Sequence, residues 1–248
     1  MDYYRRLLAP IAIAAVLLAL ALAPACSDSN DGNGNGNGAQ PTVAGGATQD
    51  SGRIDSGPVL DFAGRDPGVA FTDACQKTDE KQFTEPEAVL DPSKTYVATI
   101  RTPGGDIVLQ LFSDVPVHTN NFVFLACKGF YDGLTFHRVV RQPVDFVAQG
   151  GDPDGNCRGG PAYQIPDESS AGHRMDAGVI SMAKSGPNTT GSQFFITYEP
   201  QPDLEPDFTT FGMVTEGMDA LDTLQHVECG VGAPPESNNI ESITITEE

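Results

Sequence analysis

The chain contains no tryptophan and few basic residues. Its 248 residues include 14 Lys and Arg against 34 Asp and Glu, which gives a formal net charge of -20. A surface this acidic repels the phosphates of nucleic acids and the head groups of anionic lipids. The composition therefore argues against nucleic-acid partners, and we interpret the charge as a solvated surface that aids solubility.

Metal ligands are also scarce. No CxxC pair occurs, and the four histidines, His118, His137, His173 and His226, show no metal-ligand spacing. We expect each histidine to be a packing or surface residue, and we expect neither a metal site nor a cofactor.

Two stretches match known motifs only in part. Ser181 and Lys184 form an SxxK sequence, but no KTG occurs and no SDN lies in the folded region. The chain from Asp152 begins like a calcium-binding loop, but Cys157 and Tyr163 stand where Gly and Glu belong. We exclude a serine-acylating enzyme and interpret the second stretch as a turn.

The N-terminus has the features of an export signal. Arg5 and Arg6 precede an apolar run from Leu7 to Ala25, interrupted by two prolines, and Cys26 follows it directly. The run resembles the bacterial lipobox, which implies lipidation of Cys26. An uncleaved membrane span is the alternative, and a twin-arginine signal is a third interpretation. We therefore expect an exported domain, held at the membrane by a lipid or by the signal segment and lying outside the cytoplasm.

The remaining chain divides by composition. Residues 1–26 are the predicted signal peptide, and residues 27–68 are rich in Gly, Asn and Ser, which predicts a disordered tether. Residues 69–92 form an N-terminal extension. Residues 93–248 are long enough for one domain with a single core.

Four cysteines lie beyond the signal: Cys75, Cys127, Cys157 and Cys229. An even number in an exported chain favours two disulfides, and four cysteines allow three pairings that the sequence does not separate. Free buried thiols are the alternative.

The folded part reads as many short strands with few helices. Turns rich in Gly and Pro separate alternating apolar segments, which favours a closed or nearly closed antiparallel barrel over βαβ units. We predict strands at 95–101, 106–112, 134–140, 146–150, 178–183, 192–198, 209–214 and 242–246, and helices at 117–129 and 216–227.

One charge lies in an apolar strand. Leu134, Phe136, Arg138 and Val140 recur at period two, so the sequence predicts that they share one face. A guanidinium in that setting needs either a carboxylate partner or a function.

Several ordered motifs carry a family resemblance. FHRVV, FVAQGGD, GVISMAKSGPNTTGSQFFIT and FTTFGMV together resemble the cyclophilin family of peptidyl-prolyl cis-trans isomerases, from about Ser93 to Glu248. The resemblance implies a mainly β fold, a closed eight-stranded antiparallel barrel capped by two α-helices. It also implies an active groove on the outer face of the barrel.

The resemblance assigns roles to individual residues. Arg138 corresponds to the family's catalytic arginine and Gln149 to the glutamine that holds the substrate backbone, with Phe146 beside them. The substrate-binding residues that it implies are Val147, Ala183, Lys184, Gln193, Phe195, Leu204 and Phe208. Gly151 and Asp152 correspond to structural positions.

Some positions depart from the family pattern. Val147 stands where Met is frequent, Asp203 replaces a tryptophan and Phe208 replaces a histidine, while the loop Arg141–Asp145 is two residues longer. These changes resemble the bacterial branch, and the Asp203 change should weaken cyclosporin binding more than catalysis.

The resemblance implies an isomerase that acts on X-Pro bonds of unfolded or folding polypeptides. With the export signal we expect it to act outside the cytoplasm, and we expect a monomer. Two alternatives stay open on the same fold. One is a module that binds proline-containing peptides without turnover, and the other is a chaperone that acts independently of proline.

Overall fold

A computed structural model describes residues 63–205 and 207–248. The predicted signal peptide, Cys26 and residues 27–62 of the predicted tether lie outside the described residues. Within those that are described, no helix has the length and apolar character that crossing a bilayer requires.

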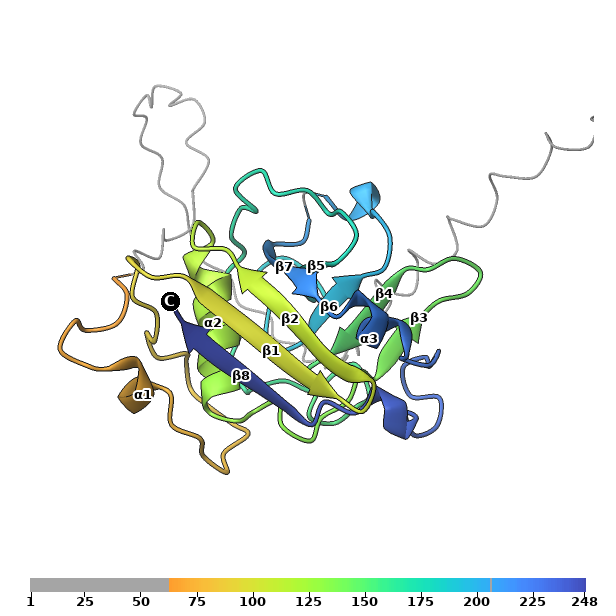
Figure 1. Cartoon of the computed structure of the whole chain (residues 1–248), viewed down its shortest axis with the longest axis horizontal. Helices are drawn as coiled ribbons and strands as arrows, with labels where there is room; N and C mark the ends of the chain where they lie inside the picture. Colours follow the sequence, from red (N-terminus) through yellow and green to blue (C-terminus); the bar gives the residue numbers. More distant parts are fainter. Residues whose placement is uncertain (1–62, 206) are drawn as a thin grey trace, which may run out of the picture. The chain divides into compact units, whose positions relative to one another are not determined.

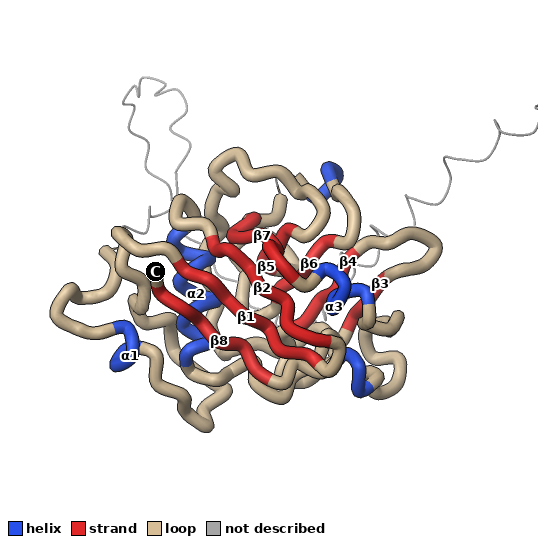
Figure 2. Tube along the Cα trace, in the orientation of Figure 1, coloured by secondary structure: helices blue, strands red, loops and turns tan. Residues whose placement is uncertain are grey.

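Eight antiparallel strands form one curved sheet (Figures 1 and 2). Along it the strands follow the order β3-β4-β6-β5-β7-β2-β1-β8. Alternating burial explains the strands: in β1, Tyr96, Ala98 and Ile100 are buried and the residues between them are more exposed. The strands are β1 (Tyr96–Thr102), β2 (Gly105–Leu111), β3 (Arg138–Val140), β4 (Val147–Gly150), β5 (Val179–Met182), β6 (Phe194–Thr197), β7 (Thr210–Glu216) and β8 (Ser242–Glu247).

The predicted closed barrel is not confirmed. Among the described residues no ladder joins the two end strands, β3 and β8, so the sheet is open there. The strand predicted at 134–140 is reduced to β3, and the residues before it make single contacts instead. Thr135 forms an isolated bridge with Asn239, and the Phe136 amide donates to the Asn238 carbonyl at 2.8 Å.

Both predicted helices are present, and the structure contains a third, short helix. The described residues hold α1 (Phe71–Ala74), α2 (Pro116–Cys127) and α3 (Met218–Asp222), so the expected number of two is not confirmed. Helix α3 is shorter than predicted because the chain turns back after it, and Val227 forms a bridge with Val139 of β3. Short 3-10 turns occur at η2 (Pro202–Leu204) and η3 (Glu236–Asn238).

Helix α2 is buried on all sides, because the sheet covers one side and the N-terminal extension covers the other (Figure 1). The Asn120 side chain accepts from the Val89 amide at 2.9 Å and donates to the Glu87 carbonyl at 2.9 Å. The rings of Phe83 and Phe124 meet edge-on at 5.2 Å. The extension is therefore packed into the core.

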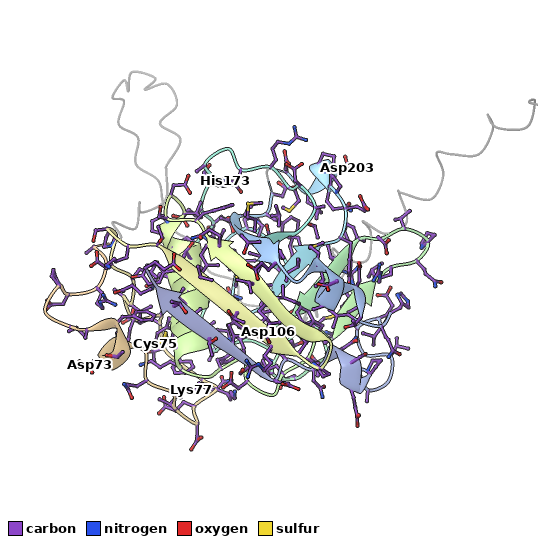
Figure 3. The ribbon with its side chains drawn as sticks, in the orientation of Figure 1. Asp73, Cys75, Lys77, Asp106, His173 and Asp203 are labelled. Carbon is purple, nitrogen blue, oxygen red and sulfur yellow. A yellow bond between two sulfur atoms is a disulfide. The ribbon has the colours of Figure 1, made fainter. Side chains whose placement is uncertain are left out.

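The four cysteines form two disulfides, Cys75–Cys127 and Cys157–Cys229. The first joins the residue after α1 to the last residue of α2, and Cys75 is labelled in Figure 3. Each bond closes a long loop and is expected to stabilise the fold by about 2–4 kcal/mol. The structure thus selects one of the three pairings that the sequence allows.

Candidate active site

A row of paired residues crosses the outer face of the sheet. Arg138 on β3 is opposite Gln149 on β4, Gln149 is opposite Phe195 on β6, and Phe195 is opposite Ser181 on β5. Side chains of directly paired residues point to the same face. The sheet register therefore brings together residues that are far apart in sequence.

The predicted shared face of Phe136 and Arg138 is wrong. Phe136 packs edge-on against Phe194 at 5.9 Å and belongs to the main core, whereas Arg138 lies on the outer face with Gln149. The reason is that β3 begins only at Arg138, so the strand alternation does not extend back to Phe136. The arginine does not interrupt an apolar face.

The Arg138 guanidinium is held by three neighbours. Its Nη1 donates to Gln149 Oε1 at 3.4 Å, its Nε lies 3.5 Å from Glu228 Oε2, and its Cζ lies 5.9 Å from the centre of the Phe146 ring. Only 12% of the Arg138 side chain is exposed. Burial lowers the pKa of Arg138 and Glu228 opposes that effect, but an arginine stays protonated in either case.

A hydrogen-bond chain continues from Arg138 across the groove. Gln149 Nε2 donates to Gln193 Oε1 at 2.9 Å, and Gln193 Nε2 donates to the Gly159 carbonyl at 3.0 Å. In each glutamine Oε1 accepts and Nε2 donates, so these hydrogen bonds fix the orientation of both side-chain amides. Gln149 and Gln193, both predicted from the sequence, therefore act as one unit.

A second apolar cluster, separate from the main core, lies beside this row. Phe195 and Phe208 meet edge-on at 5.5 Å. The cluster consists of Val147, Met175, Val179, Phe195 and Leu204, with Phe146, Ala183 and Phe208 packed against it. The sequence missed Met175 and Val179, although Val179 precedes Ser181 by two positions on the same strand and so shares its face.

The remaining predicted groove residues lie at the edge of this cluster. The Ala183 amide donates to the Gln193 carbonyl at 2.8 Å. Lys184 directs its ammonium to Asp167 at 2.8 Å and lies 5.9 Å above the Phe208 ring. Asp203, labelled in Figure 3, precedes buried Leu204 on the turn η2. The structure thus gathers all ten predicted site residues of the domain in one region.

Glu228 is a site residue that sequence reasoning missed. It lies 90 positions after Arg138 in an irregular segment, and neither motif nor periodicity marks it. Its neighbour Cys229 is tied to Cys157. The only sequence signal for Glu228 was its position next to a cysteine for which a disulfide was predicted.

His137 lies behind the disulfide. The residue is 1% exposed. One of its imidazole nitrogens and the Sγ atoms of Cys157 and Cys229 all lie within 4.8 Å of one another. Because those sulfurs are bonded to each other, neither is a thiolate that could bind a metal ion. Burial lowers the pKa of His137, and Asp152 partly opposes this shift.

The turn after β4 is organised by Asp152. Its buried carboxylate accepts from the amides of Asp154 at 2.8 Å, Asn156 at 3.1 Å and Arg158 at 3.1 Å. The stretch is a turn, as predicted from the sequence. It leads directly to Cys157 and to Gly159, the acceptor of the Gln193 amide.

The serine of the SxxK sequence is covered by the outer apolar cluster, where its hydroxyl lies 3.6 Å from Met175 Sδ. Ser181 is fully buried with its hydroxyl 3.2 Å from that of Thr210, whereas Lys184 is turned toward Asp167. The groove instead presents a fixed cation beside an apolar wall. Such a cation can donate a hydrogen bond to an atom whose electron density rises during a reaction.

Comparisons with known sequences agree with this geometry. The family described as "Cyclophilin type peptidyl-prolyl cis-trans isomerase/CLD" matches residues 97–246. A peptidyl-prolyl cis-trans isomerase of Synechococcus elongatus is 48% identical over 134 residues, which cover 54% of this chain and 89% of the relative. Another, peptidyl-prolyl cis-trans isomerase B of Bacillus subtilis, is 48% identical over 118 residues, covering 47% of this chain and 80% of the relative.

A solved structure is similar as well. The crystal structure of a Cryptosporidium parvum cyclophilin type peptidyl-prolyl cis-trans isomerase superposes with a TM-score of 0.52 and 31% identity, over 61% of this chain and 98% of that one. The same protein was also crystallised in the presence of the dipeptide Ala-Pro.

Proposed function

The chain belongs to the cyclophilin family of peptidyl-prolyl cis-trans isomerases, and from this we propose that it accelerates X-Pro rotation in exported, folding proteins through Arg138. The observation that carries the proposal is the row of Arg138, Gln149 and Phe195 beside the outer apolar cluster. The Cryptosporidium parvum structure obtained with Ala-Pro supports a proline-containing substrate.

The reaction requires no bond to be made or broken. Amide resonance raises the rotation barrier of peptide bonds to about 18–20 kcal/mol. In the twisted transition state the proline nitrogen recovers a lone pair that can accept a hydrogen bond. Arg138, held in a largely desolvated position, donates more strongly to that nitrogen than to the planar ground state.

The apolar cluster holds the proline ring in place during rotation about the X-Pro bond. Phe195, Val147 and Leu204 form a wall for the proline ring, while the acyl side of the bond turns. Gln149 holds the flanking backbone by a hydrogen bond. Every one of these groups comes from a single chain, so one copy of the chain contains the whole proposed site.

The direct test is the rate of cis-trans exchange at an X-Pro bond in a short peptide, measured with and without the protein. Acceleration at catalytic concentration supports the proposal. Tight binding of the same peptide without any acceleration refutes it.

Gln149→Ala tests the hydrogen-bond chain. It removes the acceptor of Arg138 Nη1 and the donor to Gln193, so we expect kcat/KM to fall about tenfold, the value of a charged hydrogen bond. Gln110→Ala is the matched control, because Gln110 lies on β2 and donates to the Tyr96 carbonyl at 3.2 Å, outside the groove. Equal loss in both variants contradicts the role of Gln149.

We also propose that the protein is exported and anchored at the membrane through lipidated Cys26. The apolar run before that cysteine supports this. In a bacterial host, labelling with a fatty-acid analogue should mark the wild type, and Cys26→Ser should lose the label. A Cys26→Ser protein that is unlabelled but still sediments with membranes points instead to an uncleaved span.

A second candidate function has one observation in its favour. Glu228 lies beside the Arg138 guanidinium and partly neutralises it. A cation engaged in this way suits a module that binds proline-containing segments without turnover. The exchange measurement described above distinguishes the two functions.

A further inference from the structure

We propose that Glu228 is a positioning residue for Arg138, and that the Cys157–Cys229 disulfide keeps Glu228 in place for this role. The inference rests on the proposed function of Arg138. It adds two parts that neither the motifs nor the comparisons assign: a carboxylate that orients the guanidinium, and a covalent bond that orients the carboxylate.

The first step is the geometry of the guanidinium. Glu228 Oε2 lies 3.5 Å from Nε, and Gln149 Oε1 accepts from Nη1 at 3.4 Å. These two contacts reach different edges of a planar group, so together they fix its plane. Nη2 is then the remaining nitrogen for a substrate atom. A free arginine side chain would lose its rotamer entropy on reaching the transition state, whereas one held in place has already lost it.

The second step is the segment that carries Glu228. Val227 is bridged to Val139, but the chain beyond it is exposed: Val231 is 69% exposed, and Gly230 and Gly232 have positive φ. The Glu228 side chain is itself 47% exposed. An exposed carboxylate in a glycine-containing segment has little to hold it unless its neighbour is anchored. Cys229 provides that anchor.

The disulfide also connects the Glu228 segment to the turn that contacts Gln193. Cys157 belongs to the turn organised by Asp152, and Gly159 in the same turn accepts the hydrogen bond from Gln193. These contacts therefore form a closed series around Arg138. On one side, hydrogen bonds lead from Arg138 through Gln149 and Gln193 to the Gly159 carbonyl. On the other side, Glu228 leads through its neighbour Cys229 and the disulfide to Cys157, two residues before Gly159.

This series of contacts predicts that the disulfide and the Glu228 carboxylate both act by orienting the Arg138 guanidinium, and so both affect kcat. Breaking either one releases the guanidinium, so breaking both should cost no more than breaking one. A disulfide that only stabilises the fold would leave kcat unchanged below the melting temperature. The two possibilities are separated by a double-mutant cycle.

The experiment compares the wild type with Glu228→Gln, with the pair Cys157→Ser and Cys229→Ser, and with all three changes together. For an X-Pro peptide we expect kcat to fall about tenfold in each, with KM changed by less than about twofold, because misplacement of a catalytic group affects the transition state more than binding. The pair Cys75→Ser and Cys127→Ser is the matched control. It also removes one disulfide and lowers the melting temperature, but it should keep the wild-type kcat.

A second readout follows the arginine directly. The NMR signal of the Arg138 Nε–H should shift and exchange faster with water in Glu228→Gln and in the Cys157 and Cys229 variant, and Glu228→Asp should restore part of the protection. Unchanged or higher kcat in Glu228→Gln, or effects of the two changes that add in the cycle, overturns the proposal. If even the wild type fails to accelerate exchange, the proposed function fails, and the NMR comparison still decides whether Glu228 and the disulfide hold Arg138.

Discussion

Arg138→Ala is expected to lower kcat/KM for an X-Pro peptide by about 100- to 1000-fold, the effect of removing one preorganised donor from a transition state. The loss should appear mainly in kcat, because the hydrogen bond forms only once the proline nitrogen becomes an acceptor. The fold should persist, since the side chain lies on the outer face of the sheet and contributes no volume to the main core. Arg138→Lys should recover little, because an ammonium cannot keep the two-edged contact with Gln149 and Glu228.

Arg101→Ala is the matched control. Arg101 also lies on a strand and pairs through its Nε with a carboxylate, Asp106 at 3.2 Å, but it sits on β1 and away from the groove. Asp106 is labelled in Figure 3. Arg101→Ala should leave kcat/KM unchanged. Wild-type activity in Arg138→Ala, or a fall in melting temperature of many degrees, would show that Arg138 forms a structural ion pair instead.

Asp152→Ala is expected to lower the free energy of unfolding by about 3 kcal/mol, an effect similar to the loss of one disulfide. Asp152 is 2% exposed, and its carboxylate is the acceptor for three backbone amides. Alanine leaves the amides of Asp154 and Asn156 without this acceptor, whereas the Arg158 amide keeps its bond to Asn156 Oδ1 at 2.9 Å. Hydrogen bonds to a charged acceptor are stronger than those between neutral groups. The midpoint of urea unfolding, measured at constant slope, reports the change.

Asp154→Ala is the control for Asp152→Ala. Asp154 is an exposed carboxylate in the same turn, and its loss should change the free energy of unfolding by less than about 0.5 kcal/mol. Similar losses in the two variants would mean that the turn tolerates an unpaired amide. In that case the Asp152 carboxylate is not what orders the segment that carries Cys157.

Local patterns located most of the elements, and the resemblance to the cyclophilin family located the site. Strands β1 and β2 alternate between buried and more exposed positions, and period-two alternation is visible in sequence. The groove residues were found because FHRVV, FVAQGGD and GSQFFIT are ordered motifs. Residues on neighbouring strands then needed only the sheet register to come together.

The missing parts depend on contacts that are distant in sequence. Phe136 was placed on the wrong face because a strand was assumed to begin before Arg138, and the true boundary is set by the bridge between Thr135 and Asn239. The cysteine pairing and the approach of Glu228 to Arg138 depend on how irregular turns close. No periodicity encodes such turns, since their residues are held by individual hydrogen bonds and by one disulfide.

The packing of the N-terminal extension determines how the domain would respond to a mechanical pull. Tension applied to the chain ahead of residue 63 first meets the ion pair of Arg65 with Glu247 on β8, at 2.9 Å, and then the bond from Cys75 to Cys127 on α2. In the sheet order, β8 is at one end, and β3 and β4, which carry Arg138 and Gln149, are at the other. Tension would therefore be taken up first by α2 and by β8. Neither of these elements carries Arg138 or Gln149.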